Sequence, residues 1–393
     1  MVKNMPKHDL SSVNSFVLRK QHLTKDTKTD DILQIVKEII GLHATNATTP
    51  YLSLFARTCN FSKEHLDEEL YVKRNLGKIR CMRKTVHILP KELIQAVYSA
   101  TAKMVELTSE KYSQNLGVSR KQYEEASKAI LETLKGTGMT TKEIKKVLGT
   151  KVNISAVVNL MCDQGILIRG KPQNSWKSNI HTYYRFRDHF PDMDLDAVDE
   201  EKARELLIKR YVAAFGPVSL NDVVWWTGFR MNEAKRVLEK LQNQLTRIEI
   251  FNLKGDYLMP SSDGEMLYSL KPEGYVLNFL PSLDLYLMGY KERERYVNSK
   301  HFNYVFDGSG NCTSTILLNG EVIGVWDVAR TEPWVKIFFF EEVEEAVLRD
   351  VQGMAKEVGR FIVDKDVQVI ECDSMAPLTH RTAGGFMSPL KGS

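Results

Sequence analysis

One order of helices and strands occurs twice in the middle of the chain, and it limits the fold more than any other feature. Residues 116–192 predict two helices joined by a glycine-containing turn, a third helix, and two strands around a polar loop. Thr140 or Thr141, with Glu143 close behind, is placed to cap the second helix, and Gly165 is placed to end the third. Three helices followed by a hairpin is the order of the winged helix, a variant of the helix-turn-helix.

The second copy of this pattern lies in residues 193–262. A long helix, a short helix capped by Ser219, a third helix and a hairpin follow one another. Trp225 and Trp226 lie in the short helix, where packing is a more frequent role than stacking on nucleic acid. The repetition itself predicts two domains of the same kind.

The two ends of the chain differ from the middle. In residues 1–115 we expect helices near 11–21, 29–41, 62–70 and 90–107, and a strand that ends at Pro90, an order that leaves a further winged helix open. After about residue 262, aromatic and β-branched runs alternate with glycine-rich turns, including an Asn319-Gly320 hairpin turn, and residues 346–362 predict one helix. Residues 263–393 are therefore expected to form a barrel or a strongly curved sheet.

Composition excludes several classes of protein. Hydrophobic residues make up 43% of the 393-residue chain, yet no apolar run is long enough to cross a membrane, and the N-terminus has no signal-peptide core. Five scattered cysteines without a CxxC pair indicate reduced thiols in an intracellular protein. We expect a cytoplasmic, nucleoid-associated protein in a prokaryote, or a nuclear or cytoplasmic one in a eukaryote.

The charge is segregated along the chain. The net charge is only +4, but residues 73–84 hold six basic residues and no acidic one. Such segregation suits a face that binds a polyanion, although a solvated surface explains it equally well. No GxSxG, HExxH or Walker sequence is present, and the nine histidines form no metal-like cluster, so we predict neither a metal nor a cofactor.

Two stretches remain unexplained by packing alone. "GLHATNATTPYLSLFARTC" (41–59) is unusually polar after a predicted helix. In "LPSLDLYLMGYKERERY" (280–296), Asp284 lies among apolar residues, and its burial is costly unless it caps a helix or pairs with a nearby cation such as Lys291, Arg293 or Arg295. From the residues alone, the chain is predicted to be a multi-domain protein that binds double-stranded DNA.

Four stretches, in order, carry a resemblance to a known family: "GLHATNATTPYLSLFAR" (41–57), "IRCMRKTVHILP" (79–90), "FLPSLDLYLMGYKER" (279–293) and "ILLNGEVIGVWDV" (316–328). They resemble the winged-helix DNA glycosylases of the YcaQ-like, or azinomycin-resistance, type, which unhook interstrand crosslinks. The resemblance implies an α+β fold of three tandem winged-helix domains (1–115, 116–192 and 193–262) followed by a β-barrel-like domain (263–393), with a basic, concave channel for DNA.

The resemblance also implies a catalytic segment. Where characterised members carry Gln-apolar-Gln or Gln-apolar-Asp to position a water, this chain has His43-Ala44-Thr45. His43 is a candidate hydrogen-bond acceptor or general base, and Thr45 or Asn46 a candidate to hold the water from the other side. The alternative is that His43 only caps the end of the preceding helix.

Eight basic residues are predicted to contact DNA, and for Arg83 and Lys84 the alternative is ordinary solvated charge. They are Arg57, Arg80, Arg83, Lys84, Lys171, Lys177, Lys291 and Arg293.

Three functions follow from these observations. The first is a monomeric, monofunctional DNA glycosylase that hydrolyses the N-glycosidic bond of bulky or crosslinked N7-alkylated purines in duplex DNA. The second is a non-catalytic winged-helix protein, either a transcription regulator or a lesion-recognition factor, which the replaced glutamines favour. The third and weakest is a small-ligand cleft for which the winged helices are only a scaffold.

Overall fold

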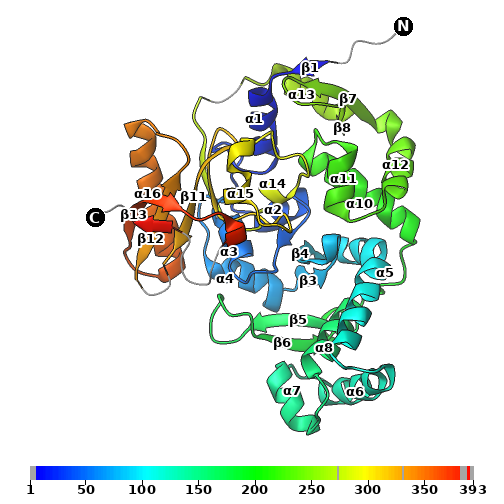
Figure 1. Cartoon of the computed structure of the whole chain (residues 1–393). Helices are drawn as coiled ribbons and strands as arrows, with labels where there is room; N and C mark the ends of the chain where they lie inside the picture. The colour runs from blue at the N-terminus through cyan, green and yellow to red at the C-terminus, as the bar shows by residue number, and fades with distance from the viewer. Residues whose placement is uncertain (1–5, 272–273, 330–331, 381–386, 390–393) are drawn as a thin grey trace.

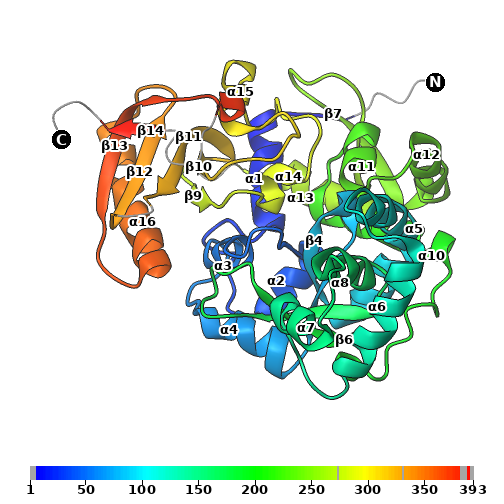
Figure 2. The same ribbon diagram turned by 60° about the horizontal axis from the view of Figure 1, so that its bottom comes forward.

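The computed structural model describes residues 6–271, 274–329, 332–380 and 387–389, and these residues form a mixed arrangement of helices and sheets. The first helices lie in the middle of the molecule, the C-terminal sheet lies on one side, and α10–α12 (residues 200–240) lie on the other (Figures 1 and 2). Among the described residues, no helix combines the length and the apolar character that a bilayer crossing requires.

The N-terminal segment, up to residue 115, combines helices with short strands. Its elements are β1 (Lys7–His8), α1 (Leu10–Lys20), α2 (Ile32–Glu38), β2 (Leu42–His43), α3 (Thr49–Phe55), α4 (Lys63–Asp67), the π-helical turn η1 (Glu68–Val72), β3 (Leu76–Arg80), the 3-10 turn η2 (Met82–Lys84), β4 (Val86–Pro90) and α5 (Lys91–Asn115). Strands β2, β4 and β3 form a small antiparallel sheet in that order. The single strand expected before Pro90 is thus a hairpin, because η2 turns the chain back on itself.

Residues 116–192 contain α6 (Arg120–Thr133), α7 (Thr141–Leu148), α8 (Ile154–Asp163), β5 (Leu167–Pro172), β6 (His181–Arg185) and α9 (Phe186–His189). The predicted order of three helices and a hairpin is present. The Thr140 side chain accepts a hydrogen bond from the Glu143 amide and so caps α7 as expected. Gly165 follows α8 with φ of 65°, the left-handed conformation that ends many helices. Buried side chains between residues 118 and 183 form a core cluster of their own.

Residues 193–262 contain α10 (Glu200–Phe215), α11 (Leu220–Thr227), α12 (Met231–Lys240), β7 (Leu245–Ile250) and β8 (Tyr257–Pro260), with 3-10 turns η3 (Gln242–Gln244) and η4 (Ser261–Asp263). Ser219 caps α11 by accepting from the Asp222 amide, as predicted. The N-terminal strand β1 adds to this hairpin by pairing in parallel with β7. The boundaries between the four expected domains and the count of winged helices remain predictions.

The rest of the chain is rich in strands. Its elements are α13 (Gly264–Ser269), β9 (Leu277–Leu280), α14 (Leu285–Met288), η5 (Ser299–His301), α15 (Phe302–Val305), β10 (Thr315–Leu318), β11 (Glu321–Val328), β12 (Trp334–Phe339), α16 (Glu345–Val363), β13 (Gln368–Met375), η6 (Leu378–His380) and β14 (Met387–Pro389). Asn319 and Gly320 join β10 to β11 with positive φ at both positions, as the Asn-Gly pair predicts.

Of the two shapes expected for this segment, a barrel and a strongly curved sheet, a closed barrel is not found within the described residues. Six strands form one open sheet in the order β14-β13-β12-β11-β10-β9, and its two edge strands do not pair with each other. Helix α16 packs its Val351 and Ala355 against Val335 and Ile337 of the sheet core. Because a helix buries that apolar face, the sheet does not need to close on itself.

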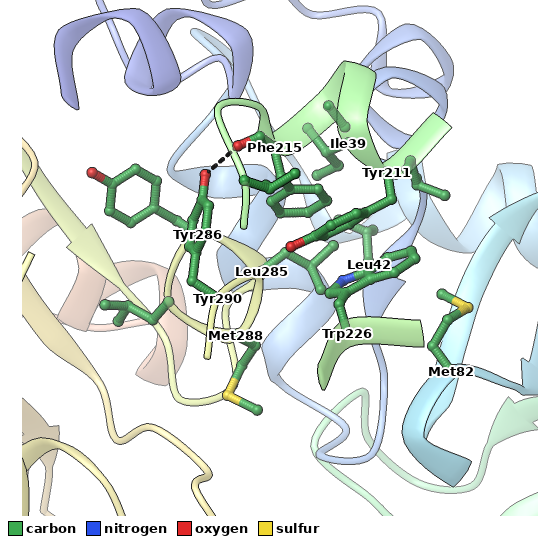
Figure 3. Close-up of a cluster of buried hydrophobic side chains, with 14 of the residues drawn as sticks. Ile39, Leu42, Met82, Tyr211, Phe215, Trp226, Leu285, Tyr286, Met288 and Tyr290 are labelled. Atoms are coloured by element: carbon green, nitrogen blue, oxygen red, sulfur yellow. Dashed lines mark hydrogen bonds between the residues drawn. The ribbon is translucent and has the colours of Figure 1, made fainter. Parts of the chain in front are cut away.

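The largest core cluster joins segments that are far apart in the sequence. Figure 3 shows Tyr211 and Phe215 of α10 and Trp226 of α11 packed with Tyr290, which follows α14. The Tyr290 hydroxyl donates to the Phe215 carbonyl at 2.8 Å, and the Tyr211 hydroxyl donates to the Gly289 carbonyl at 2.6 Å. These bonds fix the start of the 291–296 segment against α10.

Candidate functional site

His43 lies on the short strand β2, where it pairs with a second histidine. The β2–β4 register places His43 opposite His87, and the ring centroids are 5.1 Å apart in an edge-to-face arrangement. The two residues are only 4% and 3% exposed. His43 is therefore a buried strand residue, so the alternative in which it merely caps the preceding helix does not describe its position.

Each imidazole forms one hydrogen bond through Nδ1, in both cases with a backbone atom of a residue two positions away in the sequence. The Thr45 amide donates to Nδ1 of His43 at 3.4 Å, and Nδ1 of His87 lies 3.3 Å from the Thr85 carbonyl oxygen. Burial lowers the pKa of His43 well below its usual value, and the neighbouring His87 and Arg83 lower it further. Burial also lowers the pKa of His87 to about 4, and Arg83 contributes in the same direction. Both rings are therefore neutral at pH 7.

The rest of the polar segment follows β2 at the surface. Thr45 and Asn46 are exposed, and the Asn46 amide donates to the Ser282 hydroxyl at 3.2 Å. Thr49, at the start of α3, donates to the Ser282 carbonyl at 2.9 Å. The 41–59 stretch is thus polar partly because it holds the 281–284 loop in place, a role that the sequence did not reveal.

The turn η2 presents a basic side chain beside this pair. Arg83 and Lys84 have φ of 51° and 62°, the left-handed region that residues other than glycine seldom adopt. The Arg83 guanidinium lies 3.5 Å from the centroid of the Trp225 ring on α11. Burial, followed by the charge of Arg293, lowers the pKa of Arg83 to about 10. Strain of this kind persists only where surrounding contacts hold it, and it is frequent at functional sites.

Two further cationic side chains lie near the Trp225 indole ring. The Lys291 ammonium lies 4.9 Å and the Arg293 guanidinium 5.4 Å from the Trp225 ring centroid, and Arg293 also donates to the Gly310 carbonyl at 2.8 Å. We call Trp225 with Arg83, Lys291 and Arg293 the Trp225 platform. Within the described part of the chain, none of the three cations forms an ion pair with a carboxylate, so their charge is available to an anion.

The sequence favoured a packing role for both Trp225 and Trp226, but in the structure the two residues have different surroundings. Trp226 is buried at 3% exposure and packs against Tyr211, as predicted. Trp225 is half-buried, and its ring carries the three cations. Its indole nitrogen is buried without a hydrogen-bond partner among the described residues.

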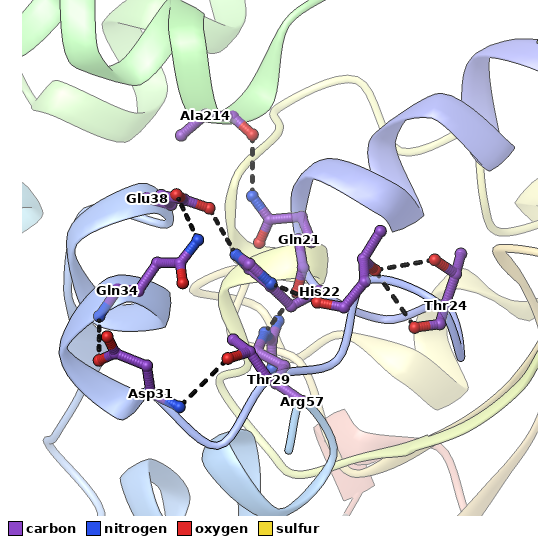
Figure 4. Close-up of polar contacts among 10 residues, drawn as sticks. Gln21, His22, Thr24, Thr29, Asp31, Gln34, Glu38, Arg57 and Ala214 are labelled. Carbon is purple, nitrogen blue, oxygen red and sulfur yellow. Dashed lines mark hydrogen bonds and ion pairs between the residues drawn. The ribbon is translucent and has the colours of Figure 1, made fainter. Parts of the chain in front are cut away.

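Arg57 was predicted to contact DNA, and that prediction is wrong. Its side chain is fully buried and forms a two-pronged ion pair with Asp284, with both N···O distances at 2.8 Å. It also donates to the Gln21 carbonyl at 2.9 Å, within the polar network shown in Figure 4. Asp284 caps α14 by accepting from the Tyr286 amide, as one alternative held, but its ionic partner is Arg57 and none of the nearby cations.

Within the described residues, the remaining predicted cations do not lie over the Trp225 ring and are not counted in the Trp225 platform. Arg80 pairs with the buried Asp163 at 3.2 Å, and Lys171 pairs with Asp67 at 3.0 Å. Lys177 lies 5.6 Å from the ring centroid of its neighbour Trp176. Lys84 is exposed beside a surface pocket of about 340 Å³ that Lys103, Arg204 and Arg230 also line. DNA contact by these residues stays a prediction, and it is weakest for Arg80, whose charge is already satisfied.

His87 is the site residue that sequence reasoning missed. It lies in "TVHILP", which we read only as a strand that carries the family resemblance. A single histidine inside an apolar strand was the available signal, because such a group needs a specific environment. Among the described residues, no group of three or more histidine, cysteine or acidic side chains is arranged to hold a metal ion.

The class of protein to which this fold belongs follows from a family comparison, and it is the DNA glycosylases. Residues 36–361 match the family described as DNA glycosylase AlkZ-like, and the chain belongs to that family. The resemblance read from the four sequence stretches is thereby confirmed.

Two comparisons describe relatives of this chain. It is 20% identical over 342 residues to the interstrand DNA cross-link repair glycosylase of Streptomyces sahachiroi, covering 83% of this chain and 89% of that protein. The structure of Streptomyces sahachiroi DNA glycosylase AlkZ aligns with a TM-score of 0.75 at 18% identity, over 93% of this chain and all of that one. This likeness establishes a shared fold.

Proposed function

We propose that this protein is a DNA-repair glycosylase that hydrolyses the N-glycosidic bond of bulky or crosslinked N7-alkylated purines in duplex DNA. The observation that carries the proposal is the unpaired cationic Trp225 platform beside two buried, neutral histidines. The cations suit a DNA phosphate, and the histidines offer polar ring atoms without adding charge. The name of the Streptomyces relative, a cross-link repair glycosylase, supports the same class of lesion.

Hydrolysis of the N-glycosidic bond of such a purine requires few groups from the protein. A purine alkylated at N7 is cationic and is therefore already a good leaving group. The enzyme must position a water and stabilise the positive charge that develops on the sugar. Polar groups such as His43, His87 and Thr45 meet the first requirement without a strong nucleophile, a metal or a lysine adduct. A crosslinked base joins both strands, so an open surface suits it better than a deep pocket for a flipped base.

A base-release assay tests this function. The protein is incubated with duplex oligonucleotides that contain N7-methylguanine or a nitrogen-mustard crosslink, and abasic sites are counted. We expect abasic sites and salt-dependent binding of the duplex by a monomeric protein. Binding without base release from any alkylated duplex would refute the glycosylase and leave a DNA-binding protein.

One observation favours that second function, a lesion-recognition factor or regulator without catalysis. His43 and Thr45 occupy the positions at which the resemblance leads us to expect glutamine and glutamine or aspartate. The retained polarity of the segment argues against it, as does the unpaired charge beside the histidines, since a regulator has no need of a neutral histidine pair at this place.

A further inference from the structure

The hydrogen bonds of the two histidines fix which nitrogen of each ring carries the proton. A neutral imidazole has one N–H donor and one acceptor nitrogen. Because the Thr45 amide donates to Nδ1 of His43, that nitrogen is an acceptor and the proton lies on Nε2. Because a carbonyl oxygen only accepts, Nδ1 of His87 donates to Thr85, and Nε2 of His87 holds the lone pair. The rings therefore have opposite tautomers.

Both Nε2 atoms are left for something else to bind. Neither forms a hydrogen bond to another of the described residues, so each is free to bind a water or a substrate atom. The ring centroids are 5.1 Å apart. A water that makes hydrogen bonds of about 2.9 Å to two nitrogens needs those nitrogens within roughly 6 Å of each other, an approach that rings at this centroid distance allow.

We propose that His87 is a catalytic residue whose Nε2 accepts a hydrogen bond from the attacking water, while His43 donates its Nε2–H to the oxygen of the same water. The proposal rests on the glycosylase function given above. It reverses the role expected for His43, which becomes the positioning donor, and it gives the acceptor role to a residue in the next strand of the sheet.

The reaction balances with these groups. The water oxygen forms a bond to C1′ of the deoxyribose, and the bond from C1′ to N9 of the purine breaks. The electron pair of that bond leaves with the base and neutralises its N7-alkyl cation. One water proton passes to Nε2 of His87 and then to bulk solvent.

The lowered pKa of His87 fits this role. With a pKa of about 4, His87 is a neutral acceptor throughout the neutral range, and the charged group that faces it, Arg83, keeps it so. A water oxygen that is bonding to a positively charged sugar carbon is far more acidic than free water. A weak base is therefore sufficient to take the proton late in the reaction.

Two variants of His87 and one control test the role. Leucine in His87→Leu keeps bulk but has no acceptor, whereas glutamine in His87→Gln restores an acceptor oxygen. We expect His87→Leu to lower the rate of base release from N7-methylguanine duplex by about 100-fold, the size of a lost acid–base contribution. Duplex affinity and its salt dependence should not change, and His87→Gln should recover part of the rate. His189→Leu is the matched control, because His189 is also buried, with burial lowering its pKa to about 4, but it packs on Phe190 in α9.

Histidine NMR gives a readout that does not depend on activity. Long-range ¹⁵N–¹H correlation spectra of ¹⁵N-histidine-labelled protein should show the proton on Nδ1 of His87 and on Nε2 of His43. The reverse assignment for His87 overturns the proposal even if His87→Leu fails to fold. An active wild type with an equally active, folded His87→Leu overturns it while leaving the glycosylase intact. A wild type that releases no base refutes the glycosylase itself and the role of His87 with it.

Discussion

His43 shows how the identity of one side chain changes the chemistry available at one place in a fold. Glutamine, which the resemblance leads us to expect there, offers a carbonyl acceptor and an amide donor on one flexible side chain. Imidazole offers one of each in a fixed plane, and here the Thr45 amide occupies the acceptor. His43 alone therefore lacks half of what glutamine supplies, and the neighbouring ring of His87 is the group proposed to supply the rest.

This comparison predicts the behaviour of three variants at the catalytic segment. His43→Gln should retain base release within about tenfold of wild type, because the amide restores a donor; the loss expected of a missing acid–base group is about 10²–10⁴. His43→Ala and Thr45→Ala should lose base release while keeping affinity for undamaged duplex. Counting abasic sites alongside a binding titration checks both. An active His43→Ala protein would remove the histidine from the mechanism.

Arg57 and Asp284 give a second prediction at the scale of residues. Both side chains are fully buried, so removing one charge leaves the other without a partner in the interior. Asp284→Asn should lower the free energy of unfolding by about 3–5 kcal/mol. Urea denaturation measures this loss. The exposed pair Arg120–Glu124 is the control, since Glu124→Gln there should cost less than about 0.5 kcal/mol. Equal losses at the two sites would show that Arg57 is not the buried structural partner described above.

At the scale of elements, local signals in the sequence were sufficient wherever the structure itself is local. Thr140 and Ser219 cap their helices, Gly165 ends α8, and Asn319-Gly320 turns a hairpin, because each depends on backbone conformation within a few residues. The η2 turn was not predicted. Left-handed φ at Arg83 and Lys84 is intrinsically unfavourable, and distant packing imposes it: the partner of Arg83 is Trp225, which no local pattern pairs with it.

The η2 turn and α11 lead to a prediction about DNA binding. Arg83→Gln should weaken binding of duplexes of any sequence and reduce the slope of log affinity against log salt by about 1, because one phosphate contact is lost. Arg360→Gln on α16 serves as the control, since Arg360 is paired with Asp366 at 2.7 Å. Binding titrations of the duplex at several salt concentrations measure this slope for both variants and the wild type. An unchanged slope for Arg83→Gln would mean that the Trp225 platform does not contact phosphate.

At the scale of the whole molecule, the sequence indicated the β-rich end but not its shape. Alternation of apolar residues predicts strands, yet it does not say which strands become neighbours. The parallel pairing of β1 with β7 and the cover that α16 gives the open sheet both arise from segments far apart in the chain. The same holds for the site, because β2, η2, α11 and the 291–293 segment meet only in the folded protein.

Buried histidines should make the stability of the whole molecule depend on pH. Burial lowers the pKa of His87, His181 and His189 to about 4, whereas in the unfolded chain each has its usual value near 6.5. Between these values the unfolded chain binds more protons than the folded one. The contribution of these histidines to the free energy of unfolding is therefore fully present above pH 6.5 and is lost as the pH falls toward 4. At about 1.4 kcal/mol for each pKa unit, His87 alone accounts for roughly 3 kcal/mol.

Two carboxyl groups, the buried Asp163 and the half-buried Glu106, oppose this trend. Burial raises the pKa of Asp163 and of Glu106, so each favours the folded state as the pH falls. Three histidines outweigh them only if the histidine shifts are as large as described. Urea unfolding at pH 7.0, 6.0 and 5.0 should show a steady fall in the free energy of unfolding, and His87→Gln should reduce the slope. A free energy that stays constant from pH 7 to 5 would contradict the burial of neutral histidines, and with it the neutral pair on which the proposed chemistry depends.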